Sequence, residues 1–365
     1  MTQTLVLVGT AKGLFLLRSD DGRGRFEVEG PVLAGEEVYA TCIDGRGATR
    51  LFAGSVSMHW GPVVRRSDDL GATWTEQDEA SIAFPSDTGA SLNRIWQLTP
   101  GGPDEPDVMY AGVEPAALFR SDDGGHRFEL VRPLWDHPHR PEWNPGGGGL
   151  CLHTVLVHPT DPDRLLIAIS AAGVYLSDDG GGSWRASNTG IVVTFLPGSP
   201  SPEFGQCVHK VARDAADPER LYLQHHDGIY RSDDGGGTWV PMASIGGVDF
   251  GFPVVAHPSR PDTAYLLPLE GAEYRCTPDG RCTVWRTTDA GAGWTPLTDG
   301  LPQEDAHLTI LRDGFTTDGD DPAGLYFGTR SGEVYGSVDD GDSWRLLASH
   351  LPPVLSVRAA PVGTG

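Results

Sequence analysis

Four histidines are the residues of this chain with the clearest metal-binding chemistry. Two segments share one form, Cys151-Leu152-His153 and Cys207-Val208-His209, and each precedes an apolar continuation. In an extended strand, alternation places the cysteine and histidine of each segment on one side. Neutral imidazoles that converge on one point suit zinc, iron, copper or nickel, among which the sequence does not choose. The candidate ligands are His59, His153, His209 and His226.

A second set of residues supplies acids, bases and groups that hold anions. Glu114 and Glu270 are candidate general bases. Arg94 and Arg330 are candidates for holding a substrate carboxylate, because a guanidinium pairs with it through two hydrogen bonds. With a metal that polarises a carbonyl or activates water, this set predicts a metal-dependent enzyme acting on a small polar or carboxylated molecule.

An internal repeat predicts the turns that separate these residues. The pattern Ser/Thr-x-Asp-x-Gly-x-x-Trp/Phe begins at Ser67, Ser121, Ser177, Ser232, Thr287 and Ser337. A degenerate copy, Ser19-Asp21-Phe26, has Arg23 where glycine is expected. The seven starts are 48, 54, 56, 55, 55 and 50 residues apart. Ser and Asp side chains bond nearby backbone amides and Gly takes a positive φ, so each copy predicts a tight hairpin.

The segments between the copies predict an all-β fold. Three strands come before a typical repeat turn and one strand follows it, which makes a four-stranded antiparallel blade. Seven copies predict a seven-bladed β-propeller. Only two strands precede the first copy, and one strand, residues 354–361, follows the last. We therefore expect the C-terminal strand to complete the N-terminal blade, and residues 1–365 to form a single propeller domain.

The blade topology predicts that the candidate residues share one face. In such a blade, the starts of the innermost strands and the turns between the second and third strands lie on the same face. Every candidate ligand and catalytic residue named above lies at one of these positions. Long connections of residues 76–92, 132–149 and 186–206 are expected on the same face. Four glycines, 146–149, would permit a hinge or a close backbone approach. The alternatives are histidines that cap channel water and a loop that plugs the channel.

The repeat resembles the Asp box, or BNR repeat, of sialidases, sortilin-type receptors, xyloglucanases and photosystem II assembly factors. In those families the box is structural, which implies that its aspartates here are neither ligands nor catalysts. The resemblance implies a sialidase-like glycoside hydrolase as one alternative, with Arg94, Arg330 and Arg358 as an arginine triad and Tyr39 as nucleophile. Sialidases have six blades and an Arg-Ile-Pro motif not found here. Xyloglucanases place two aspartates between two propellers, whereas one propeller is expected here.

The resemblance also implies a third function, a non-catalytic propeller that binds a protein or a ligand. For a metal-dependent enzyme, the sequence leaves hydrolase, lyase and oxygenase chemistry open. It also leaves open self-association into a homo-oligomer. A formal net charge of −23 excludes nucleic acid and anionic membranes as expected partners. A small-molecule substrate is the expected partner.

The N-terminal segment and the cysteines bear on location. The first residues alternate as strand, turn and strand, without the cationic start of a signal peptide, and no run of about 18 apolar residues exists. The expected location is therefore cytoplasmic. Cys276 and Cys282 flank a short turn and are expected to be free thiols in a reducing cytosol.

Overall fold

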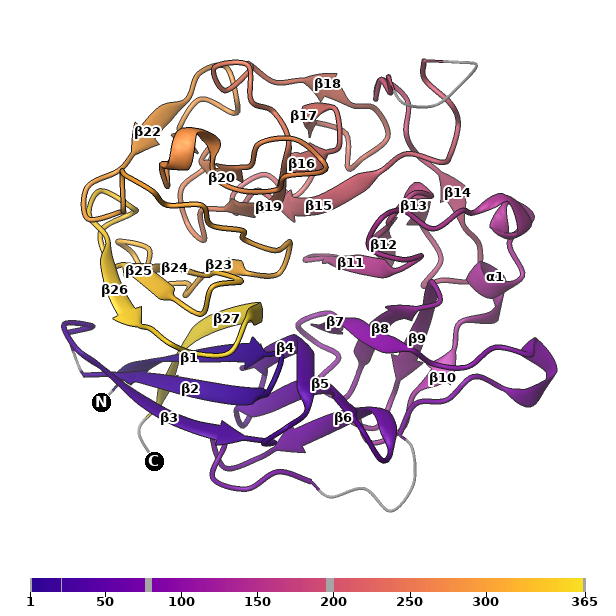
Figure 1. Cartoon of the computed structure of the whole chain (residues 1–365). Helices are drawn as coiled ribbons and strands as arrows, with labels where there is room; N and C mark the ends of the chain where they lie inside the picture. The colour runs from indigo at the N-terminus through magenta and orange to yellow at the C-terminus, as the bar shows by residue number, and fades with distance from the viewer. Residues whose placement is uncertain (1, 21, 76–80, 195–199, 364–365) are drawn as a thin grey trace. The chain divides into compact units, whose positions relative to one another are not determined.

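The chain is an all-β seven-bladed propeller of antiparallel sheets, as the repeat predicts (Figure 1). The computed structural model describes residues 2–20, 22–75, 81–194 and 200–363. Asp21 of the degenerate repeat and parts of two predicted long connections, 76–80 and 195–199, lie outside the described residues. The chain divides into two compact units, which are described separately, and the single-domain expectation stays a prediction.

Unit 1 consists of Met1–Ala34, Gly190–Pro200 and His209–Gly365. Its four sheets have the orders β27-β1-β2-β3, β15-β16-β17-β18, β19-β20-β21-β22 and β23-β24-β25-β26. The strands are β1 (Thr2–Thr10), β2 (Gly13–Ser19), β3 (Phe26–Val32), β15 (Val208–Arg213), β16 (Leu221–His225), β17 (Gly228–Ser232), β18 (Val240–Pro241), β19 (Gly251–Ala256), β20 (Ala264–Pro268), β21 (Val284–Thr287), β22 (Thr295–Leu297), β23 (Phe315–Thr317), β24 (Leu325–Gly328), β25 (Val334–Ser337), β26 (Arg345–Ala348) and β27 (Val354–Gly363). One 3-10 turn spans Pro278–Gly280.

The C-terminal strand completes the N-terminal sheet, which confirms the predicted closure. β27 pairs antiparallel with β1, so that Leu7 lies opposite Arg358 and Val8 opposite Val357. Leu7, Val8 and Val357 are fully buried. The pairing gives both strands a partner along an edge that would otherwise present free backbone groups.

The first strands of neighbouring sheets in unit 1 lie side by side. β23 contacts both β19 and β27, and β19 also contacts β16 of the sheet before it (Figure 1). Phe315, Phe327 and Trp344 pack between the sheets in one apolar cluster. This packing therefore fixes the positions of the polar groups near the starts of these strands.

Unit 2 consists of Gly35–Thr189 and Ser201–Val208. Its sheets have the orders β4-β5-β6, β10-β9-β8-β7 and β11-β12-β13-β14. The strands are β4 (Glu37–Asp44), β5 (Arg50–Ser57), β6 (Gly61–Ser67), β7 (Arg94–Pro100), β8 (Met109–Glu114), β9 (Ala117–Ser121), β10 (Glu129–Leu130), β11 (Leu152–His158), β12 (Asp161–Ile169), β13 (Gly173–Ser177) and β14 (Arg185–Ala186). Helical turns are η1 (Ser86–Thr88), α1 (Arg132–Trp135) and η2 (Arg140–Glu142).

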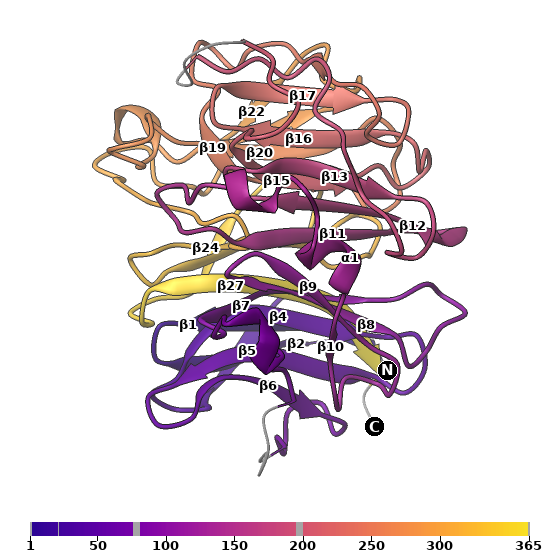
Figure 2. The same cartoon turned by 90° about the vertical axis from the view of Figure 1, so that its right-hand side faces the viewer.

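The first sheet of unit 2 has three strands among the described residues, whereas four strands were expected in each blade. β7 contacts β4 and β5 of that sheet and also β11 of the next one (Figure 2). Its side chains are thereby fixed by packing against both neighbours.

The repeat turns contain the hydrogen bonds expected of them. In the copy that begins at Ser67, Oγ accepts from the Gly71 amide at 2.8 Å and Asp69 Oδ1 accepts from the Thr73 amide at 2.8 Å. Gly71 has a φ of 92°, which favours glycine. Hydrogen bonds from Thr73 and Ser67 lower the pKa of Asp69 to about 2. These oxygens are occupied by the turn, which agrees with a structural role.

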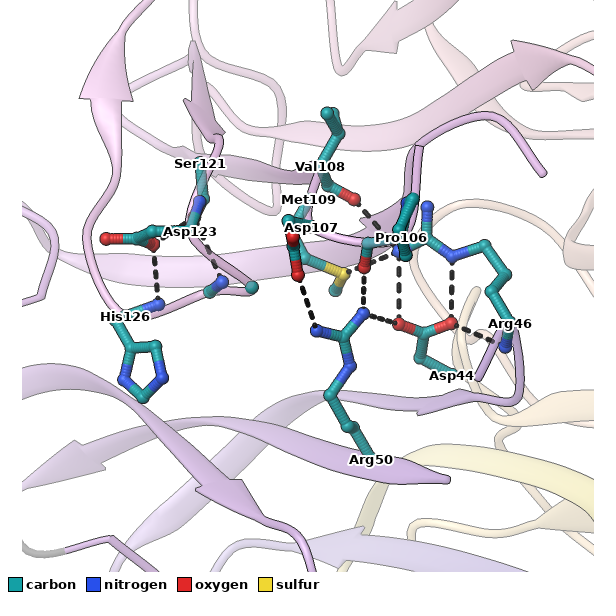
Figure 3. Close-up of polar contacts among 12 residues, drawn as sticks. Asp44, Arg46, Arg50, Pro106, Asp107, Val108, Met109, Ser121, Asp123 and His126 are labelled. Carbon is teal, nitrogen blue, oxygen red and sulfur yellow. Dashed lines mark hydrogen bonds and ion pairs between the residues drawn. The ribbon is translucent and has the colours of Figure 1, made fainter. Parts of the chain in front are cut away.

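A buried ion pair joins the β4–β5 turn to the loop before β8 (Figure 3). Asp44 Oδ2 lies 3.0 Å from Arg46 Nη2 and 2.6 Å from Arg50 Nη2. Arg46 also donates to the Val108 carbonyl at 2.9 Å. Burial raises the pKa of Asp44, but the hydrogen bonds from Arg46 and Arg50 outweigh it and lower that pKa. This network fixes the start of β8, whose other end carries Glu114.

All five cysteines are free thiols, as expected for Cys276 and Cys282. Within the described ranges, no helix has the length and apolar character needed to cross a membrane.

Candidate functional site

Three of the predicted catalytic residues meet in unit 2. Arg94 at the start of β7 lies opposite Glu114 at the end of β8. Glu114 Oε2 accepts a hydrogen bond from Trp96 Nε1 at 3.0 Å and lies 3.4 Å from Arg94 Nη1. The guanidinium carbon of Arg94 stands 4.8 Å from the centre of the Tyr39 ring, and that ring lies 5.3 Å from Trp96. We call Tyr39, Arg94, Trp96 and Glu114 the Glu114 cluster.

The local strand pattern explains this arrangement. Arg94 and Trp96 are two residues apart on β7, so alternation places both on the same side of the strand. Ile95, between them, is buried in the apolar cluster of the sheet. The Glu114 side chain is 15% exposed, and two side-chain donors hold its carboxylate.

The glycine-rich connection approaches the Glu114 cluster closely. Gly149 has a φ of 93°, and a Cβ there would lie 2.6 Å from Glu114 Oε1. Its amide donates to the Gly146 carbonyl at 3.0 Å, which closes the loop. The sequence predicted that these glycines permit either a hinge or a close backbone approach, and the structure shows the close approach.

The Glu114 cluster combines the groups that bind and activate a polar ring. Half-buried aromatic faces present apolar surface, the guanidinium donates hydrogen bonds, and the carboxylate accepts them. A carboxylate held in this way can also take a proton from water or from a sugar hydroxyl. The chemistry fits a saccharide better than a purely apolar ligand.

Two of the predicted metal ligands meet in unit 1. The rings of His209 and His226 lie 5.7 Å apart, and each stands 5.3 Å from Phe250. His209 is buried, and its Nδ1 lies 2.5 Å from the Gly251 carbonyl oxygen. Burial, followed by the charge of Arg312, holds the pKa of His209 well below its usual value. Burial also lowers the pKa of His226. Both imidazoles are therefore neutral near pH 7, the form that binds metals.

The other two predicted ligands lie in unit 2. His153 is fully buried, with Nδ1 3.0 Å from Thr154 Oγ1 and Nε2 3.0 Å from the Val208 carbonyl oxygen. Both ring nitrogens already have polar neighbours. His59 is exposed in the turn between β5 and β6. Convergence of all four histidines on one metal stays a prediction.

Glu270 and Arg330 are exposed residues of unit 1. The Glu270 amide donates to the Cys276 carbonyl at 2.7 Å, and the Arg330 amide donates to the Thr309 carbonyl at 2.9 Å. A pocket shared by all five predicted catalytic residues stays a prediction.

Sequence analysis missed the buried polar pair of Lys210 and Asp313 in unit 1, which are 2.8 Å apart. A signal was present, because Lys210 stands within an otherwise mostly apolar strand.

Comparison with known proteins relates the chain to xyloglucanases. No family model matches it. A xyloglucanase of Hypocrea jecorina is 25% identical over 295 residues, which cover 71% of this chain and 32% of that protein. A xyloglucanase of a Paenibacillus species is 23% identical over 273 residues, which cover 67% of this chain and 24% of that protein. The chain is similar to xyloglucanases. It matches about a third of those relatives' length or less.

Solved structures give the same fold. The GH74 xyloglucanase from Xanthomonas campestris matches with a TM-score of 0.63 and 19% identity, over 94% of this chain and 52% of that one. An ancestral GH74 enzyme matches with a TM-score of 0.58 and 17% identity, over 84% of this chain and 38% of that one. At these identities the likeness shows the propeller fold alone.

Proposed function

We propose that this chain is a glycoside hydrolase-like propeller whose Glu114 cluster binds a saccharide. The observation that carries the proposal is the joint placement of two aromatic rings, a guanidinium and a carboxylate whose side chain is partly exposed. The similarity to xyloglucanases supports it and suggests a β-glucan with side chains as the first substrate to test.

In this proposal Glu114 acts as the general base. Inverting glycosidases use one carboxylate to activate a water on the face of the sugar opposite the leaving group, while an acid protonates the leaving oxygen. Here Glu114 takes a proton from the attacking water, and solvent water donates the proton to the leaving oxygen. Arg94 and Trp96 keep the Glu114 carboxylate in one orientation, which such a step requires. Trp96 and Tyr39 supply the surface against which the sugar ring packs.

The test uses xyloglucan oligosaccharides with the full chain. Binding is measured by calorimetry and cleavage by the release of reducing ends. Glu114→Gln keeps the shape of the side chain, so we expect oligosaccharide affinity within about threefold of wild type. Removal of a general base typically costs about 10²- to 10⁴-fold in turnover. Tyr274→Ala removes an exposed aromatic ring of unit 1 and is the matched control.

Three outcomes decide this proposal. Loss of turnover in Glu114→Gln, with binding retained, supports it. Binding without any cleavage by the wild type overturns the hydrolase assignment and favours the ligand-binding propeller. The absence of both binding and cleavage overturns the saccharide site as well.

The neutral His209–His226 pair favours a metal-dependent enzyme as the second candidate function. A metal held there with further ligands would polarise a carbonyl or activate water. Metal content of chelator-free protein, measured by mass spectrometry, tests it. Near-stoichiometric metal that is lost in both His209→Ala and His226→Ala supports the candidate, with exposed His307→Ala as control. Metal-free wild type, or metal retained in both variants, rejects it.

A further inference from the structure

The connection of residues 132–149 in unit 2 contacts the end of β8 and the turn between β8 and β9. Arg140 Nη1 donates to the carbonyl of Ala116, a fully buried residue of that turn, at 2.5 Å. At the C-terminal end of the connection, Gly149 lies close to Glu114, since a Cβ there would be 2.6 Å from Glu114 Oε1. An opening of this connection would therefore change the surroundings of the Glu114 carboxylate.

A histidine of the connection holds it to the neighbouring sheet of β11–β14. The His139 amide donates to His137 Nδ1 at 3.1 Å, and His137 Nε2 lies 3.2 Å from the Trp184 carbonyl oxygen. Because Nδ1 accepts a hydrogen bond, the single ring proton of neutral His137 is on Nε2, which donates it to that carbonyl. Both ring nitrogens are thus used, and the neutral form of His137 suits both partners.

His139 extends this contact to β13. Trp143 Nε1 donates to the Tyr175 hydroxyl at 2.8 Å, and that hydroxyl lies 3.2 Å from His139 Nδ1. The hydroxyl oxygen accepts from the indole, and its own proton is available to donate to His139 Nδ1. The His139 ring also stacks on Phe204, with 4.1 Å between the ring centres. Hydrogen bonds and aromatic packing together therefore keep the connection closed.

This arrangement does not accommodate a second proton on His137. The proton would reside on Nδ1 and point at the His139 N–H group, so that a hydrogen bond is lost and two donors face each other. Burial and the nearby His139 ring, 4.6 Å away between centres, lower the pKa of His137, and the Trp184 carbonyl and the charge of Glu203 oppose them. The titratable groups that contact His137 or act on its charge are His139, Tyr175 on β13 and Glu203, and its own connection adds Asp136 before it and Arg140 after it.

We propose that His137 is a pH-sensitive latch, which holds residues 132–149 closed while it is neutral and releases them when it is protonated. In the closed form the pKa of His137 lies below the ordinary imidazole value of 6.5, which the open form regains. The preference for the closed form is therefore complete above pH 6.5 and weakens as the pH falls, by at most about tenfold per pH unit. The latch is independent of what the Glu114 cluster binds, so it is tested without any ligand.

The first test measures hydrogen exchange of the full chain by mass spectrometry. Exchange of residues 132–149 is compared at pH 7.5 and at pH 5.0, after correction for the intrinsic pH dependence of amide exchange. We expect protection of this segment to be about threefold to thirtyfold lower at pH 5.0, while protection of β12 in the same unit stays within about twofold. Unchanged protection of residues 132–149, or an equal loss of protection in β12, overturns the proposal.

The second test removes the titration but keeps the acceptor. In His137→Asn the amide oxygen can accept from the His139 amide, and the side chain takes up no proton between pH 5.0 and pH 7.5. Protection of residues 132–149 in this variant should therefore differ by less than about twofold between the two pH values. His126→Asn removes an exposed histidine of the same unit and should keep the pH dependence of the wild type.

Circular dichroism checks the folding of both variants. A wild-type pH dependence in folded His137→Asn overturns the role of His137, and so does a loss of the dependence in His126→Asn. If His137→Asn does not fold, the comparison of residues 132–149 with β12 in the wild type still decides the proposal.

Discussion

The indole nitrogen of Trp96 donates to Glu114 Oε2 across 3.0 Å, from one strand to its antiparallel neighbour. This bond couples a ring suited to sugar packing with the carboxylate proposed as base. Because Trp96 and Glu114 lie on paired strands, their distance is set by the sheet rather than by a loop.

Trp96→Phe separates the two roles of the tryptophan. Phenylalanine keeps an aromatic face but cannot donate to Glu114, so the carboxylate loses one of its two side-chain donors. We expect kcat on xyloglucan oligosaccharides to fall about ten- to hundredfold, since a hydrogen bond to a charged group contributes about 1.5–3 kcal/mol. KM should change less than threefold. A fall in affinity with unchanged kcat would contradict this assignment.

Gly149→Ala tests the close approach of the loop to Glu114. The added methyl would lie 2.6 Å from Oε1 at a φ of 93°, so the loop or the carboxylate must move. We expect a loss of about 1–3 kcal/mol in the free energy of unfolding and weaker oligosaccharide binding. Gly47→Ala, in the same unit, has no atom near its Cβ and is the control. Equal stability and affinity of the two variants would argue against the contact.

Ser67→Ala tests the structural role of the repeat turns. Ser67 Oγ accepts from the buried Gly71 amide, and its loss leaves that group without its side-chain acceptor. The expected cost is about 1–3 kcal/mol in urea unfolding, with oligosaccharide binding unchanged in the folded fraction. Exposed Ser91→Ala should be neutral. A specific loss of binding without loss of stability would indicate a functional role for the turn.

Lys210 predicts a pH dependence of stability. Its pKa is about 8 in the folded state and 10.5 for the ordinary side chain, so between these values the unfolded chain binds more protons. Stability contributed by this residue therefore rises as pH increases from about 8 towards 10.5. The urea midpoint of the wild type minus that of Lys210→Met is measured at pH 7.5 and at pH 9.5. This difference should be larger at pH 9.5. A constant or falling difference would mean that Lys210 keeps an ordinary pKa.

The sequence alone determined the blades and their closure. The repeat pattern is local, since serine, aspartate and glycine within a few residues build each turn by their own hydrogen bonds. The pairing of β27 with β1 followed from counting strands before the first repeat and after the last.

Only the tertiary structure decided which side chains share a site. The Glu114 cluster needs the register that sets Arg94 opposite Glu114, and one residue of slip would turn the side chains away. Lys210, Asp313 and Arg358 are more than 40 residues apart in sequence, and no local pattern relates them. His153 looked like His209 in sequence, yet its nitrogens face Thr154 and the Val208 carbonyl. Burial and hydrogen-bond partners depend on packing between strands distant in sequence, which is why composition and spacing alone do not specify them.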